Sequence, residues 1–138
     1  MNLETAQRHF RACRELMDTL YQKPVFDEWA VVSFGKAKPE ILSYDGSRPE
    51  EFVSHFHADS GPLLAEMQGR SYAIGDFEFA PDAHGSRYDA CVRLGESTYL
   101  LCNYVAGSMK DIRGDARWLK AQAPFVNLTE KFRSDPLI

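Results

Sequence analysis

The clearest indication of the fold is YDACVRLGESTYLLCNYV, residues 88–105. Its first half alternates apolar and polar residues, which is typical of a half-buried strand. The apolar positions of that half are Tyr88, Ala90, Val92 and Leu94. Gly95-Glu96-Ser97 predicts a tight turn, and Tyr99 to Val105 is almost continuously apolar, as in a central strand covered on both faces. The stretch therefore predicts an antiparallel hairpin.

Three further strands are predicted upstream of this hairpin. Residues 72–79 alternate and place Ala73, Gly75, Phe77 and Phe79 on one face. Residues 28–34 form an aromatic and β-branched run, and residues 40–44 form a shorter one. The segment Gly35-Lys36-Ala37-Lys38-Pro39 between them is short enough for a hairpin, and Asp45-Gly46 closes the second strand.

Helix-period segments surround the strands. The first has Asn2 as a predicted N-cap, ends at Pro24, and repeats apolar residues at Leu3, Ala6, Phe10, Cys13, Met17 and Leu20. The second opens with Ser47-Arg48-Pro49-Glu50, which has the form of a capping box, and Gly69 is its expected C′ stop. Its apolar face is Phe52, Phe56, Ser60, Leu63, Leu64 and Met67, and Gly61-Pro62 predicts a kink.

A final helical segment follows the last strand. Ser108 is its predicted cap, with Asp111 three residues on, and Ile112, Ala116, Leu119 and Ala123 keep helical spacing. Pro124 should kink or break it before Phe125, Leu128 and Phe132. Together the segments predict an α+β fold with a single antiparallel five-stranded sheet flanked by helices, in the order α-ββ-α-βββ-α. Residues 1–138 form one domain, and the last few residues form a flexible tail.

Bulk properties exclude several classes of protein. A chain of 138 residues suits one domain, and its formal charge of -4 with scattered Lys and Arg predicts no nucleic-acid partner. No run approaches the ~20 apolar residues of a membrane span, and the charged N-terminus has no apolar h-region, so neither a membrane partner nor a secretory signal is expected. The cysteines show no ligand spacing and are expected to be buried free thiols of a cytoplasmic protein. They are Cys13, Cys91 and Cys102.

Residues capable of chemistry are present but scattered. His55 and His57 are two apart on a helix, so they point to different faces and cannot chelate one metal. His84 lies in the polar loop of residues 81–86 without a nucleophile motif. The Asp45-Gly46-Ser47 step is expected to be a turn, not an anion site. Hence no cofactor, no metal and no enzymatic activity are predicted. The alternating charges at Asp111, Arg113, Asp115 and Arg117 predict a solvated helix face.

The large aromatics are predicted to be core residues first and interface residues second, because Trp and Tyr are enriched at interfaces. They are Phe26, Trp29, Tyr44 and Trp118. We also expect an exposed apolar surface on the second helix. Its tentative dimer and partner residues are Phe52, Val53, His55, Phe56 and Leu63.

The order of elements resembles the roadblock/dynein light-chain family and, more loosely, the longin and profilin-like folds. The residues that carry the resemblance are the apolar run 29–34, the Ser43-Tyr-Asp-Gly46 step, and the strands at 88–94 and 99–105. The resemblance implies a non-enzymatic, homodimeric interaction module that binds small GTPases or motor and scaffold subunits. Some bacterial relatives stimulate GTP hydrolysis, but that activity maps to no residue here. Gly61-Pro62 and the long C-terminal segment depart from the family pattern.

Two other functions remain open at this point. Secretion-type chaperones are also small acidic α/β dimers and bind an effector segment in extended form, although they usually have three strands before the second helix. A small-molecule sensor domain would need a cavity, and bulky side chains are available to fill one. Those side chains are Phe77, Phe79, Tyr88 and Tyr99. Co-purification with a GTPase, an unfolded effector or a metabolite would separate these functions.

Overall fold

A computed structural model describes residues 2–22, 24, 26–35, 37–81, 87–105 and 112–135. Four helices and five strands make up the described fold. In chain order these are α1 (Leu3–Tyr21), β1 (Phe26–Ser33), β2 (Glu40–Asp45), α2 (Pro49–Gly69), β3 (Phe77–Pro81), β4 (Arg87–Arg93), β5 (Thr98–Val105), α3 (Ile112–Lys120) and α4 (Ala123–Ser134). The predicted α+β class and the order α-ββ-α-βββ-α are confirmed, with the final helix divided in two.

The sheet is antiparallel throughout the described strands, with the order β2-β1-β5-β4-β3. The hairpin predicted from residues 88–105 is β4 and β5, and its register pairs Cys91 with Leu101. β5 lies between β1 and β4, which explains its continuous apolar sequence, because neighbouring helices cover both of its faces.

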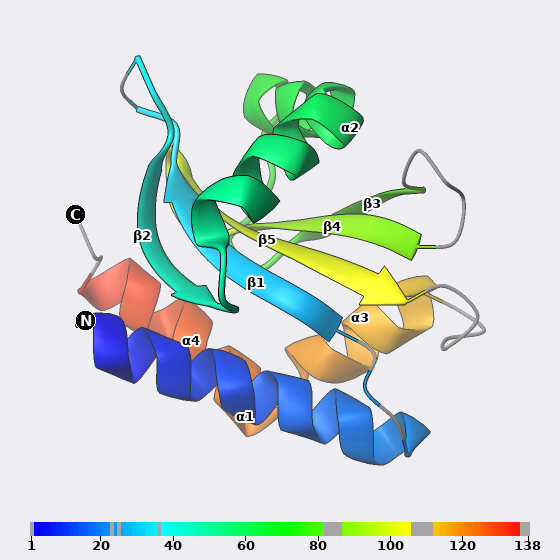
Figure 1. Cartoon of the computed structure of the whole chain (residues 1–138). Coiled ribbons are helices and arrows are strands. Elements are labelled where there is room, and N and C mark those ends of the chain that lie inside the picture. The colour runs from blue at the N-terminus through cyan, green and yellow to red at the C-terminus, as the bar shows by residue number, and fades with distance from the viewer. Residues whose placement is uncertain are drawn as a thin grey trace.

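Helices cover the two faces of the sheet unequally (Figure 1). Successive strand residues point to opposite faces, so Trp29 and Val31 face α1, α3 and α4, whereas Ala30 and Val32 face α2. Each face thus has its own apolar core. The core under α2 has these buried members: Ala30, Val32, Val53, Phe56, Leu63, Leu64, Met67, Cys91, Tyr99 and Leu101.

The third strand is shorter than the sequence predicts. The expected strand at residues 72–79 begins only at Phe77, because residues 73–76 form a turn. Gly75 has a φ of +94°, which a strand does not adopt, and the Ala73 N–H donates to the Asp76 carboxylate at 2.9 Å. The placement of Gly75 within a strand was therefore wrong.

The predicted helix caps are confirmed for α1 but not for α2. Asn2 caps α1 as predicted, since its side chain accepts the Thr5 N–H at 2.8 Å. The capping box at Ser47 is wrong: Pro49 takes the first helical turn, so Arg48 becomes the N-cap and no side chain caps the helix. Gly69 is the last helical residue of α2 and not the C′ position.

Both predicted interruptions are present. Non-helical backbone at Ser60 (φ −127°, ψ 30°) kinks α2 immediately before Gly61-Pro62, and Pro124 lies in the first turn of α4, after the break from α3. The predicted cap Ser108 and Asp111 lie outside the described residues, as do His84 and the C-terminal tail. Of the helices in the described ranges, none is long and apolar enough to cross a membrane.

Candidate functional site: a groove between α2 and the β1–β2 hairpin

An open groove of about 650 Å³ lies between α2 and the β1–β2 hairpin. Figure 1 shows the hairpin projecting beyond the sheet beside α2. The volume of the groove is within the range of small-molecule sites, which are mostly apolar with a few polar groups. The apolar side chains of the lining are those of Phe34, Ala37, Pro39, Ile41, Val53, Leu64 and Ala65. The polar lining is Lys38, Glu50, Ser54, His57 and Gln68.

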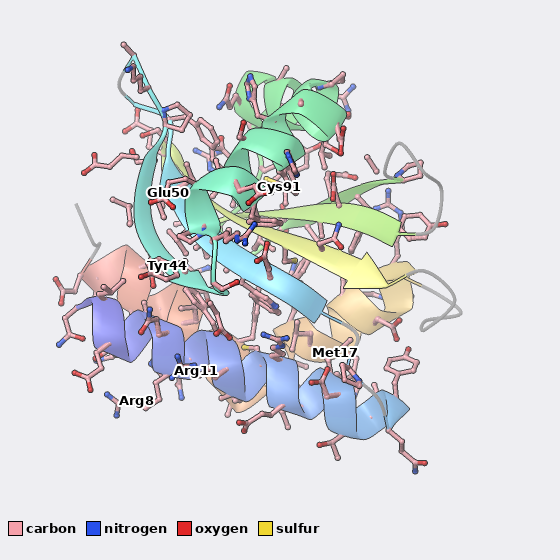
Figure 2. The ribbon with its side chains drawn as sticks, in the orientation of Figure 1. Arg8, Arg11, Met17, Tyr44, Glu50 and Cys91 are labelled. Carbon is pink, nitrogen blue, oxygen red and sulfur yellow. The ribbon has the colours of Figure 1, made fainter. Side chains whose placement is uncertain are left out.

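One side of α2 forms the first wall. The lining positions on this helix recur every three or four residues, so they share a face beside the buried one. They include Glu50, Ser54, His57, Gly61, Ala65 and Gln68. Figure 2 shows Glu50 at the start of α2, beside β2. The space next to Gly61 is open, because a Cβ built there would meet no atom within 4 Å.

A buried polar cluster ties the kink of α2 to the sheet. The Ser60 hydroxyl donates to the Asp89 carboxylate of β4 at 2.5 Å, and the Asn103 amide of β5 donates to the same carboxylate at 2.8 Å. Hydrogen bonds of this kind are needed because an unpaired buried carboxylate is costly. The cluster therefore holds the bend of the helix, and with it the shape of the first wall.

The hairpin forms the second wall. Phe34 follows β1, and its N–H donates to the Ser97 carbonyl at 2.9 Å while its ring packs 6.0 Å from that of Tyr99. Ile41, paired with Val32, faces α2 from β2. The hairpin is thus anchored to the start of β5, and its apolar side chains face the groove.

The charges of the groove are not neutralised within the described part of the chain. There, Lys38 and Glu50 form no ion pair, and both side chains are exposed. Some other surface charges are paired, as between Lys120 and Asp76 at 3.1 Å. Unpaired charges beside apolar walls are available to orient a partner.

The predicted interface residues do not form one surface. Val53, Phe56 and Leu63 are only 6%, 2% and 6% exposed and pack against the sheet, so the expected exposed apolar surface of this helix is wrong for these three residues. They were predicted to be exposed because sequence periodicity shows which residues share a helix face but not which element covers that face. His55 is exposed, and Phe52 is partly buried.

Other candidate residues have structural roles. Asp45, the last residue of β2, pairs with Arg11 and Arg14 of α1 at 3.6 and 3.5 Å. Asp115, predicted to be solvated, is 8% exposed and accepts a hydrogen bond from the Tyr21 hydroxyl, so that prediction was wrong.

Three of the four large aromatics can be placed. Trp29 is a core residue, Trp118 is partly buried, and Tyr44 is exposed. The side chain of Phe26 lies outside the described part.

The cysteines are buried free thiols, as predicted. Burial raises the pKa of Cys13 to about 12, and it raises the pKa of Cys91 and of Cys102 as well. A thiol that stays protonated is a poor nucleophile and metal ligand. Across the described residues no group of three or more His, Cys, Asp or Glu could hold a metal ion.

Sequence reasoning missed the groove because its two walls are far apart in the chain. His57, which was expected to point to a different helix face from His55, is exposed, and it borders the hairpin. The signal available was the row of small and polar residues at helical spacing beside the apolar face of α2, together with the two lysines of the hairpin segment.

Comparisons with known proteins add one partial similarity. The chain is 25% identical over 101 residues to 1,4-alpha-glucan branching enzyme GlgB 2 from two strains of Xanthomonas campestris pv. campestris. The match covers 70% of this chain but only 14% of the enzymes, so the chain spans about 14% of the length of these relatives. No protein-family model and no solved structure matches the chain.

Proposed function

We propose that this protein is a non-enzymatic interaction module that binds a protein partner in the groove between α2 and the β1–β2 hairpin. The observation that carries the proposal is the combination of apolar walls with Lys38 and Glu50, which form no ion pair with any residue that the structure describes. The setting we propose is cytoplasmic, with neither nucleic acid nor membrane as partner.

The resemblance to roadblock/dynein light-chain proteins supports the choice of partner. On that basis we propose a homodimer that regulates a small GTPase or serves as a subunit of a scaffold. The α+β order and the single antiparallel sheet are the features that such a domain requires, and they support the proposal without naming the partner. Light scattering at micromolar concentration should give roughly twice the monomer mass of 15.7 kDa. A constant monomer mass across that range would contradict the homodimer.

A matched pair of variants tests the groove. Ala65 and Ala58 are both exposed on α2, but only Ala65 lines the groove. Ala65→Arg places a long cation in the groove, whereas Ala58→Arg makes the same chemical change away from it, and both residue types favour helix. Each form of the protein is then used to capture proteins from native lysate. The expected partners are those that bind the wild type and Ala58→Arg but not Ala65→Arg.

Two results would count against this function. Capture that is unchanged in Ala65→Arg would remove the groove as the binding site. Metabolite or nucleotide turnover by the purified chain without a partner would place the protein among enzymes.

The similarity to branching enzymes favours one second candidate, a glucan-binding accessory unit. Those relatives are named for acting on 1,4-alpha-glucan, and the matched region is a small part of each. Affinity electrophoresis in gels containing glycogen separates the two functions. Retardation that Ala65→Arg abolishes would favour the glucan, whereas unaltered mobility would favour the protein partner.

A further inference from the structure

We propose that the groove receives one amphipathic α-helix of the partner protein, with an acidic side chain opposite Lys38 and a basic one opposite Glu50. This inference rests on the proposed function and specifies the form of the partner. Four observations carry it: the unequal covering of the sheet, the blocked edge of β2, the length of the groove, and its charges.

The face of the sheet under α2 is only partly covered. Strands lie about 4.8 Å apart, so five of them span roughly 20 Å, whereas one helix is about 10 Å wide. Three helices pack on the opposite face, but α2 alone packs on this one, as Figure 1 shows. The groove is where this face remains open, beside α2 and over the hairpin. A second helix is the element that completes such a layer.

An extended partner strand fits less well, because the edge of β2 is blocked. The pairing shifts between Val31 and Val32, which leaves Leu42 as an extra residue on β2 and bends the edge. Farther along, the Tyr44 carbonyl accepts the Gln7 side-chain N–H of α1 at 3.0 Å. Bulges and covered groups of this kind prevent a further strand from pairing.

The groove suits a helix of moderate length. Its α2 wall runs from Glu50 to Gln68 and bends at Ser60, a path of about 27 Å at 1.5 Å per residue. That path corresponds to about five turns of a partner helix, enough for anchors at positions i, i+3 or i+4, and i+7. The small Gly61 and Ala65 leave room for those anchors next to the helix backbone.

Charge gives the partner helix a direction. Lys38 belongs to the hairpin wall and Glu50 to the first turn of α2, and neither has an ion-pair partner among the described residues. A helix that places an acidic residue against Lys38 and a basic residue against Glu50 satisfies both. The reversed helix would bring like charges together, which disfavours that orientation.

The test selects binders without assuming their sequence. A phage-displayed library of random peptides of about sixteen residues, or about four helical turns, is panned on the full chain. Phage that also bind Ala65→Arg are removed. The expected enriched peptides repeat apolar residues with helical spacing and carry an acidic residue. The synthetic consensus should gain helical circular dichroism on binding.

Variants then locate the contacts of that consensus peptide. Ala65→Arg should weaken binding by about tenfold or more, with Ala58→Arg unchanged. Lys38→Glu should weaken it by about two- to fivefold and reduce its salt dependence.

Two results would overturn the proposal of a helical ligand. One is enriched peptides whose apolar residues alternate with a period of two, and the other is a panning in which no peptide prefers the wild type to Ala65→Arg. The proposed function fails separately, through lysate capture that Ala65→Arg leaves unchanged.

Discussion

Two adjacent residues of α2, Phe56 and His55, should respond to alanine substitution in opposite ways. Phe56 is 2% exposed and lies between α2 and the sheet, where its ring meets Phe52 edge-on at 6.0 Å. His55 is exposed on the same turn. Replacing a fully buried Phe by Ala removes its transfer free energy and leaves a cavity, at a cost of about 3–5 kcal/mol.

That cost is large for this chain. Domains are typically stable by only about 5–15 kcal/mol, so Phe56→Ala should remove about a fifth or more of the free energy of unfolding. At about 3 °C per kcal/mol, Tm should fall by roughly 9–15 °C. His55→Ala should change the free energy of unfolding by less than about 0.5 kcal/mol, as surface substitutions usually do.

Urea unfolding followed by circular dichroism measures both variants against the wild type. The fitted slope must stay constant for the comparison to report stability alone. A loss below about 1 kcal/mol for Phe56→Ala, or equal losses for the two variants, would refute the assignment of faces on this helix.

Three further substitutions or reagents test other parts of the fold. All three cysteines should resist alkylation in the native state at pH 8 and react only on unfolding; rapid native labelling would contradict their burial. Burial raises the pKa of Glu28 above 4.5, and the nearby charge of Glu51 adds to the effect. The ionised form of Glu28 therefore opposes folding. Glu28→Gln should raise Tm at pH 7, and the gain should vanish below pH 4.5, where both states are protonated; a gain that persists there would refute the linkage. Ser60→Ala removes a donor to buried Asp89 and should cost about 1–3 kcal/mol by urea unfolding, against almost nothing for exposed Ser54→Ala.

Local sequence signals predicted most of the fold. The alternation in residues 88–105, the Gly61-Pro62 kink and the break at Pro124 follow from backbone and side-chain preferences that act within a few residues. The start of β3 was missed because alternation continues through residues 72–76, while Gly75 adopts a positive φ that periodicity does not report.

The candidate site was less predictable, because its surface depends on contacts between distant segments. The charged residues next to Asp115 in the sequence predict a solvated helix face. In the structure, however, Asp115 accepts a hydrogen bond from Tyr21, which is far away in the sequence. Likewise, the face of α2 next to His57 becomes one wall of a groove only when the β1–β2 hairpin lies beside it. Single-sequence periodicity shows which residues share a helix face and does not show which elements meet there.

The positions of α1 and α4 affect how this domain can be connected to other chains. The start of α1 and the end of α4 lie near each other, on the side of the sheet away from α2 (Figure 1). Domains with neighbouring ends at the surface tolerate fusion and insertion. A tether attached at either of these helix ends would lie on the side of the sheet opposite α2. A fluorescent protein, a solid support or a flanking domain therefore need not obstruct the groove. Such a domain can be held by both ends while its α2 face points outward.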